Sequence, residues 1–212
     1  MCSSDLDGEG SEARQIEAAR RGDLAAFNSL VLLYQARVYN LCYRMLGDPD
    51  EAADATQDAF LSAWRAMSRF KGEGFRTWLM RIATNGCLDV LRARKRHPTF
   101  SLDSPAISDG EGEELEPLPI ADPDPSIDPL GSALRAEVAD TIQAGLSLLP
   151  EDQRAALVLV DMQGYSYEEV ATVTGTNLGT VKSRINRARG RMRDYLRERG
   201  VLPSRQTTVR EE

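Results

Sequence analysis

A regular stripe of apolar residues runs through residues 175–192. Its members recur four, three and four positions apart, at Val181, Ile185, Ala188 and Met192. This spacing predicts a helix that buries one face against a core. Six basic side chains occupy other positions of the same helix: Lys182, Arg184, Arg187, Arg189, Arg191 and Arg193. A helix buried on one side and cationic on the other suits the major groove of DNA.

The residues just before this helix have the pattern of a shorter helix followed by a tight turn. Ser166 and Glu169 are spaced as a capping box, in which each side chain bonds the backbone of the other residue. Gly175 is placed to end that helix in the left-handed conformation, and Asn177 is placed to cap the next one. Two short helices joined by a glycine-containing turn predict a helix-turn-helix. An ordinary helical hairpin with a solvated basic face is the alternative.

Helical periodicity also extends over residues 11–97, which we expect to form a separate domain. A long amphipathic run over residues 24–46 ends at Gly47. Asp48 is placed to cap the following helix, with Pro49 in its first turn. The expected buried face of that helix consists of Ala53, Thr56, Phe60, Ala63, Trp64 and Met67.

A second face of this same helix is largely acidic. It is formed by Glu51, Asp54, Asp58, Leu61 and Arg65. A stripe of this kind is commonly a solvated surface, and as a docking face it requires a basic partner helix. A loop over residues 70–74 leads to a further helix, which we expect to begin near Phe75 and to end at residue 96. Its expected apolar contacts are Trp78, Leu79, Ile82 and Leu91, with Arg76 and Arg81 on the outside.

Charge is distributed unevenly along the 212 residues, and the net charge of −7 hides this. Residues 65–97 contain 9 basic and 2 acidic side chains, whereas residues 98–132 contain 9 acidic and no basic ones. The latter segment also holds 7 of the 10 prolines and lacks periodicity, so we expect an acidic, Pro-rich linker. Its expected role is a solvated spacer, and mimicry of nucleic acid is a second hypothesis. Residues 1–10 are expected to form a disordered tail, and residues 200–212 a second tail.

The composition also argues against several classes of protein. No apolar run approaches the roughly 18 residues that span a bilayer, and the acidic N-terminus does not resemble a secretory signal. The chain has three widely spaced cysteines and no C-x-x-C motif, which fits a reducing cytosol: Cys2, Cys42 and Cys87. Cys42 and Cys87 are expected to be buried in the hydrophobic core. Phosphate-loop and zinc-protease motifs are absent, and His97 is the only histidine. We therefore expect a cytoplasmic protein that is not an enzyme and that needs no metal or cofactor.

Residues 50–96 and 146–196 together resemble two parts of a known family. Region 2 of the extracytoplasmic-function (ECF) group of bacterial RNA polymerase sigma factors is similar to the first segment, DEAADATQDAFLSAWRAMSRFKGEGFRTWLMRIATNGCLDVLRARKR. Region 4 of the same group is similar to the second, LSLLPEDQRAALVLVDMQGYSYEEVATVTGTNLGTVKSRINRARGRMRDYL. The resemblance implies an all-α fold with two small helical domains, region 2 over residues 11–97 and region 4 over residues 133–199, joined by the linker of residues 98–132.

The resemblance also implies three binding surfaces. The acidic helix binds the clamp coiled coil of the polymerase's largest catalytic subunit, through Glu51, Asp54, Gln57, Asp58 and Leu61. The loop at 70–74 and the helix after it bind the −10 element as it opens, through Lys71, Arg76, Trp78, Arg81, Asn85 and Arg92. The helix-turn-helix binds the −35 element as a duplex, through Thr180, Lys182, Ser183, Arg184, Asn186 and Arg187, with Arg154 and Arg189 as further phosphate contacts. Asn85 is expected in a pocket for an extruded base, because an amide both donates to and accepts from a base edge.

The implied partners are core RNA polymerase, promoter DNA and an anti-sigma factor. The loop between Phe70 and Phe75 is one residue shorter than is common in the family. The resemblance therefore does not predict which bases this chain prefers in the −10 element. A stand-alone transcriptional regulator that binds operator DNA is the alternative function. It accounts for the helix-turn-helix but gives no role to the acidic stripe, the short loop or Asn85.

Overall fold

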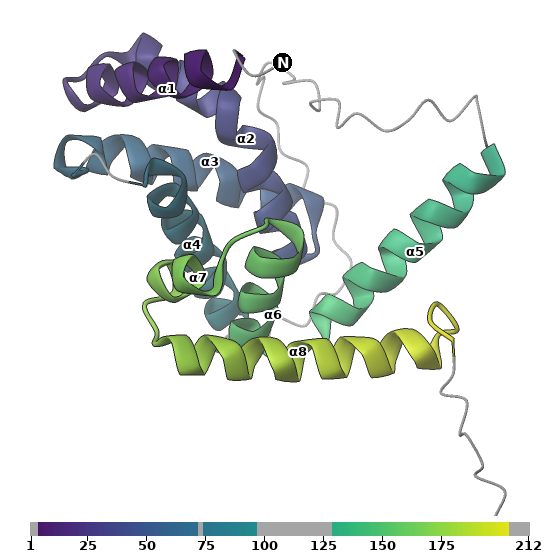
Figure 1. Cartoon of the computed structure of the whole chain (residues 1–212). Coiled ribbons are helices and arrows are strands. Elements are labelled where there is room, and N and C mark those ends of the chain that lie inside the picture. The colour runs from purple at the N-terminus through teal and green to yellow at the C-terminus, as the bar shows by residue number, and fades with distance from the viewer. Residues whose placement is uncertain (1–3, 72–73, 97–128, 204–212) are drawn as a thin grey trace, which may run out of the picture.

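The structure is a computed structural model that describes residues 4–71, 74–96 and 129–203. In these ranges the chain forms helices and no strands, which confirms the all-α class. The elements in chain order are α1 (Ser4–Arg20), α2 (Leu24–Leu46), α3 (Pro49–Ala66), the 3-10 turn η1 (Met67–Arg69), α4 (Phe75–Arg96), α5 (Pro129–Ser147), α6 (Glu151–Leu157), the π-helical turn η2 (Val158–Met162), α7 (Tyr167–Thr174) and α8 (Leu178–Glu198). Figure 1 shows α1 to α4 grouped together and α8 running along the bottom edge of the molecule.

Helix α2 and the start of α3 lie at the residues that the sequence predicts. Asp23 caps α2 by accepting the Ala26 N–H at 3.1 Å, and Gly47 ends the helix with φ of 83°. Asp48 caps α3 by accepting the Glu51 N–H at 2.9 Å. These contacts satisfy backbone groups that a helix end otherwise leaves unpaired. Short-range chemistry therefore sets the boundaries of α2 and α3.

The buried face of α3 differs from the predicted one at its first position. Three of the predicted residues are buried: Phe60, Ala63 and Met67. Two more, Thr56 and Trp64, are half-buried. Ala53, however, is exposed, and Ala52 is fully buried in its place. Alanines three and four residues before Thr56 both fit a helical stripe, so the pattern alone did not distinguish them.

The region at the start of the chain is helical where a tail was expected. Residues 1–10 were assigned to a disordered tail, whereas α1 begins at Ser4. The C-terminal half of α1 is fixed by Ala19, which is buried, and by Ile16, which packs against the core. The helix extends toward the N-terminus from this packed turn, because adding a residue to an existing helix is easier than starting one.

The linker is shorter than predicted at its C-terminal end. α5 begins at Pro129, three residues before the expected end of the linker at 132. Proline is compatible with the first turn of a helix, where its missing N–H has no helical partner. The remaining linker residues, with His97 before them, lie outside the described residues, as do positions 204–212 of the C-terminal tail.

In the second domain α8 packs across α6 and α7. Val181, Ile185 and Ala188 are fully buried, and Met192 packs against the core while partly exposed. This confirms the apolar stripe on which the helix-turn-helix prediction depends. The basic positions of α8 are thereby turned away from the core.

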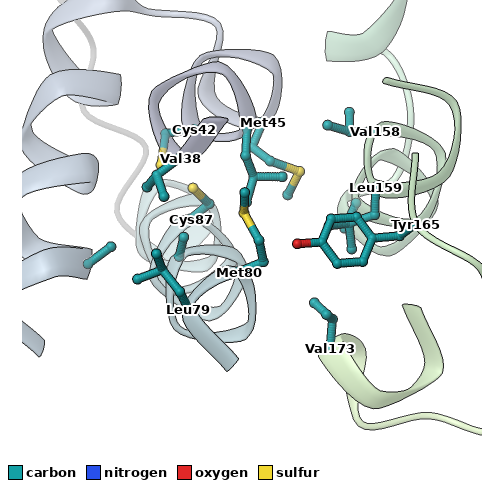
Figure 2. Close-up of a cluster of buried hydrophobic side chains, with 14 of the residues drawn as sticks. Val38, Cys42, Met45, Leu79, Met80, Cys87, Val158, Leu159, Tyr165 and Val173 are labelled. Atoms are coloured by element: carbon teal, nitrogen blue, oxygen red, sulfur yellow. The ribbon is translucent and has the colours of Figure 1, made fainter. Parts of the chain in front are cut away.

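The two domains share one continuous hydrophobic core. Figure 2 shows Met45 and Met80 of the first domain facing Val158, Leu159 and Tyr165 of the second. None of these five side chains is more than 3% exposed. Because apolar surface of both domains leaves water at the same interface, we expect the domains to unfold together.

Cys42 and Cys87 belong to the part of this core inside the first domain. Both are free and fully buried, which confirms that they are core filler. The hydrogen bond between the two thiols, together with burial, raises the pKa of Cys87. A thiol in this state is a poor nucleophile, because the reactive form is the thiolate.

The described helices are also informative about membranes and metals. Within the described ranges, no helix is long and apolar enough to cross a membrane. Over the same residues, no three His, Cys, Asp or Glu side chains are grouped so that they could hold a metal ion.

Candidate nucleic-acid interface

The helix-turn-helix is closed by the predicted caps. The Ser166 hydroxyl accepts the Glu169 N–H at 3.2 Å, and the Glu169 carboxylate accepts the Ser166 N–H at 2.8 Å. Gly175 ends α7 with φ of 64°, and the Asn177 side chain accepts the Thr180 N–H at 2.8 Å to begin α8. The turn geometry fixes α8 relative to α7, as a recognition helix requires.

Most of the predicted −35 residues lie on the exposed face of α8. The exposed members are Lys182, Ser183, Asn186 and Arg187. Thr180 is half-buried at the start of the helix, and the Ser183 hydroxyl donates to its carbonyl at 3.0 Å. Arg184 is less available, because its guanidinium forms an ion pair with Asp152 at 2.6 Å. The structure thus brings together two cations and one amide that can reach base edges in a major groove.

The two arginines expected as additional phosphate contacts are both engaged inside the protein. Arg189 binds the Asp161 carboxylate, with its Nε at 3.0 Å, and donates to the Tyr167 hydroxyl at 3.3 Å. Arg154 is only 6% exposed, so its assignment to DNA is wrong. It donates instead to the backbone carbonyls of Met45, of Ser147 at 2.8 Å and of Leu149 at 3.3 Å.

The −10 residues of α4 and the preceding loop occupy a common face. Lys71, Arg81 and Asn85 are exposed, so their side chains are available to a ligand. Arg92 is exposed too, and it pairs with Asp89 at 3.0 Å. Two of the cations and the amide that were predicted to contact the −10 element, Arg81, Arg92 and Asn85, are therefore exposed on α4.

Trp78 and Arg76 are more deeply integrated into the fold. The Trp78 ring lies 4.8 Å from the Phe70 ring and 5.6 Å from the Phe75 ring, and it is half-buried. Arg76 was expected on the outside of α4. Its guanidinium instead donates to the Gln163 carbonyl at 2.7 Å and lies 4.2 Å above the ring of Tyr165. Arg76 points to the second domain because a guanidinium gains from stacking on an aromatic face as well as from hydrogen bonding.

The acidic face of α3 is open to solvent. Asp54, Gln57 and Asp58 are exposed, and Leu61 is 43% exposed. Glu51 departs from this pattern, because its carboxylate forms an ion pair with Arg94 at the end of α4. Three polar side chains and one exposed leucine remain available for a partner of complementary charge.

Several interdomain contacts were missed by the sequence reasoning. Arg44 donates to the Gln143 side chain at 3.1 Å, and Gln143 donates to the Tyr43 carbonyl at 3.2 Å. The Lys95 ammonium lies 2.6 Å from the Glu151 carboxylate and lowers the pKa of that carboxyl group. No short-range pattern marks these pairs, since each joins residues on different domains.

The cap of α8 can be tested directly. Replacing Asn177 by alanine removes the acceptor of the Thr180 N–H and is expected to lower the free energy of unfolding by about 1 kcal/mol. Urea unfolding followed by circular dichroism measures this change. Asn186→Ala is the matched control, because Asn186 is an exposed amide on the same helix and its loss is expected to change stability by less than about 0.5 kcal/mol. Equal stability of the two variants would contradict the capping role.

The capped helix-turn-helix with its free cationic face defines a DNA-binding protein. Family comparison refines this class: Sigma-70 region 2 matches residues 30–97, and Sigma-70 region 4 matches residues 139–192. The RNA polymerase sigma-H factor of Pseudomonas aeruginosa is 41% identical over 179 residues, which cover 82% of this chain and 88% of that protein. The ECF sigma factor SigE of Mycolicibacterium smegmatis is 40% identical over 178 residues; the match covers 82% of this chain and 64% of SigE.

A solved structure agrees with these sequence relationships. The sigma factor RpoE of Bartonella quintana, in complex with the anti-sigma factor NepR, matches with a TM-score of 0.58 and 25% identity over 81% of this chain and 96% of that one. The chain belongs to the ECF group of RNA polymerase sigma factors. As a sigma factor it is a transcription initiation factor.

Proposed function

We propose that this chain binds core RNA polymerase through the exposed face of α3 and directs it to promoters with a −10 and a −35 element. The observation that supports this most strongly is the joint presence of an exposed cationic face on α8 and an exposed acidic face on α3 in one chain. A DNA-binding face alone does not bind the polymerase. The acidic face of α3 supplies a surface for that contact. The protein acts in the cytoplasm, together with the polymerase. It catalyses no reaction itself, because the polymerase forms the phosphodiester bonds.

The core-binding surface consists of Asp54, Gln57, Asp58 and Leu61, with Glu51 at its edge. The exposed leucine supplies apolar contact area, and the carboxylates select a basic helix and speed its association. Glu51 contributes indirectly, because its ion pair with Arg94 joins the start of α3 to the end of α4.

The −10 surface consists of Lys71, Arg81, Asn85 and Arg92, with Trp78 beneath it and Arg76 at its boundary with region 4. The cations hold the phosphates of the separated strand, which fixes its position without selecting a sequence. Asn85 holds the edge of an extruded base, so that the strand cannot pair again. Trp78 packs against the rings of Phe70 and Phe75, and its half-exposed ring is proposed to add a stacking contact to a base.

The −35 surface consists of Lys182, Ser183, Asn186 and Arg187, with Arg184 and Thr180 at its border. Lys182 and Arg187 suit the paired acceptors of guanine, and Asn186 suits adenine. Thr180 lies in the first turn of α8, where backbone N–H groups favour a phosphate. An anti-sigma factor is a further proposed partner, as NepR is for the Bartonella protein.

A stand-alone regulator that binds an operator is the alternative, and the acidic face of α3 argues against it. The decisive experiment measures promoter opening by purified core polymerase with and without this chain. Permanganate reactivity at the −10 region is followed over a pool of genomic promoter fragments. Opening that requires both components is the expected result. Tight binding of the chain alone to duplex DNA, with no effect on the polymerase, would favour the regulator.

The α3 face allows a separate prediction. Asp58→Lys reverses a charge at the centre of the exposed stripe and is expected to weaken binding to core polymerase about tenfold. A fluorescence titration of labelled protein with core polymerase measures the affinity. Glu137→Lys makes the same charge change at an exposed position of α5 and is expected to leave the affinity unchanged. Equal weakening by both variants would show that net charge, and not the α3 face, governs binding.

A further inference from the structure

An ion pair joins the first turn of α6 to the DNA-binding helix α8. Nη2 of Arg184 donates to the Asp152 carboxylate at 2.6 Å, across 32 residues of the chain. Figure 1 shows α6 lying against α8, which brings the two side chains together. The Asp152 side chain is 50% exposed and that of Arg184 is 21% exposed. An ion pair this open to solvent contributes little to stability, so its main consequence is for the position of the Arg184 guanidinium.

The ion pair leaves part of the Arg184 guanidinium available to a ligand. Within the described part of the chain, its Nε and Nη1 atoms donate to no protein atom. Both atoms reach solvent, because neither is a buried atom without a partner. Nη2 carries two N–H groups, and each of the two donor edges of a guanidinium includes one of them. An acceptor on one edge therefore leaves the other edge with two parallel donors.

Arg184 lies between two residues of the proposed −35 surface. It follows Thr180 by four residues and precedes Arg187 by three, and both spacings place side chains on the same side of a helix. Thr180 lies in the first turn of α8, where backbone N–H groups favour a phosphate, and Arg187 is exposed. A duplex that contacts both residues therefore passes over Arg184.

A second aspartate pairs with α8 in a different way. Asp161 of η2 accepts from both Nε and Nη2 of Arg189, with Nε at 3.0 Å, and the Tyr167 hydroxyl accepts from Nη1 at 3.3 Å. All three nitrogens of Arg189 are thus engaged inside the protein, whereas a single nitrogen of Arg184 is engaged by Asp152. The two aspartates carry the same charge and hold the same helix, so Asp161 is a matched control for Asp152.

We propose that Asp152 is a positioning residue for −35 recognition, which holds the Arg184 guanidinium so that its remaining donor edge binds one guanine of the element. This rests on the proposed function and adds a determinant of its specificity. Guanine presents O6 and N7 as two acceptors that match such an edge. A held guanidinium loses less rotamer freedom on binding than a mobile one, and it cannot turn to the surrounding phosphates. The Asp152 carboxylate also repels phosphates near Arg184, which disfavours contacts that do not depend on sequence.

The test measures base preference with core polymerase and the full chain. Each template has the −10 element of a promoter identified in the promoter-opening assay, a randomised −35 element and a barcode in its transcribed part. Sequencing of the run-off transcripts gives the preference at every −35 position. Asp152→Ala removes the carboxylate that holds Arg184. Asp161→Ala makes the same change of charge at the other aspartate that pairs with α8.

Asp152→Ala is expected to lower the preference for guanine at one −35 position about tenfold and to leave the other positions unchanged. Arg184→Ala is expected to give the same loss at the same position, because both variants remove one contact. The double variant is expected to lose no more than either single variant, since Asp152 acts through Arg184. Asp161→Ala is expected to retain every base preference, whatever its effect on the total amount of transcript.

A merely structural role of Asp152 gives a different pattern, because it lowers transcription from all templates by the same factor. The proposal is overturned if Asp152→Ala keeps the wild-type preference at every position. It is also overturned if the double variant loses more preference than Arg184→Ala alone, because Asp152 then acts by another route. A change of the same preference in Asp161→Ala overturns it as well, since a displacement of α8 then accounts for both variants.

Arg184→Lys covers the case in which Asp152→Ala does not fold. Lysine keeps the positive charge beside Asp152, but an ammonium lacks the planar pair of donors of a guanidinium. Transcription with the guanine preference lowered about tenfold at the same single position is the expected result. Full retention of the preference in Arg184→Lys overturns the proposal, because a point charge at this position then suffices.

Failure of the positioning role and failure of the proposed function give different results. A wild type that starts transcripts and selects −35 bases, with the same selection in Asp152→Ala and Arg184→Lys, overturns the positioning role alone. A wild type that starts no transcript with core polymerase overturns the proposed function, and the positioning role with it.

Discussion

Arg154→Ala is expected to lower the free energy of unfolding by about 3 kcal/mol, the largest effect on stability among the substitutions considered. Arg154 is 6% exposed, and its guanidinium donates to the carbonyls of Met45, Ser147 and Leu149. Removing it leaves buried acceptors without a donor, and a buried polar group without a partner is costly. Burial lowers the pKa of Arg154, because the environment disfavours its charge, yet the three carbonyls hold it in place.

Urea unfolding followed by circular dichroism and by tryptophan fluorescence measures this loss. The two probes are expected to give a single common transition, because the domains share one core. Arg187→Ala is the matched control, since Arg187 is exposed on α8 and its removal is expected to change stability by less than about 0.5 kcal/mol. If Arg154→Ala lowers the free energy of unfolding no more than the control does, water satisfies the three carbonyls as well as the guanidinium does.

The helix boundaries were predictable because their causes are local. Asp48 and Asn177 bond backbone groups three residues away, and Gly47 adopts a positive φ that other residues avoid. Each of these contacts is contained in a window of a few residues. The sequence pattern therefore predicts them without knowledge of the fold.

The interdomain contacts were not predictable, because their causes are remote. Arg154 meets the Met45 carbonyl across 109 residues, Arg76 meets the Gln163 carbonyl across 87, and Gln143 meets the Tyr43 carbonyl across 100. In each case a side chain binds a backbone atom, so the partner has no distinctive residue type. Arg154 and Arg76 were assigned to DNA because they are basic, and no nearby residue in the sequence indicated a partner inside the protein.

The candidate surfaces lie between these two cases. The exposure of Asp54, Asp58 and Leu61 follows from the amphipathic pattern of α3, and the structure agrees with it. Arg184 and Arg76 have basic side chains of the predicted type, but tertiary partners engage them. Periodicity identifies which face of a helix is polar, and it does not show which polar groups are already paired.

The double variant Lys182→Ala with Arg187→Ala is expected to reduce transcription from a promoter with a −35 element about hundredfold. Each side chain is exposed, and within the described part of the chain neither is in an ion pair, so both are free to bind DNA. A paired contact to a base is worth about 1–3 kcal/mol, and two such losses of about 1.4 kcal/mol combine to the stated factor. The measurement is run-off transcription with saturating core polymerase.

Arg193→Ala is the control for this double variant, because Arg193 is an exposed cation on the same helix that pairs with Asp194 at 3.3 Å. It is expected to change transcription less than about threefold. The salt dependence then separates the two roles within the recognition face. Loss of a phosphate contact lowers the slope of log affinity against log salt by about one, whereas loss of a base contact leaves the slope and relaxes the base preference. If the double variant transcribes as well as Arg193→Ala, α8 is not the helix that binds the −35 element, and the cationic face of region 4 has another partner.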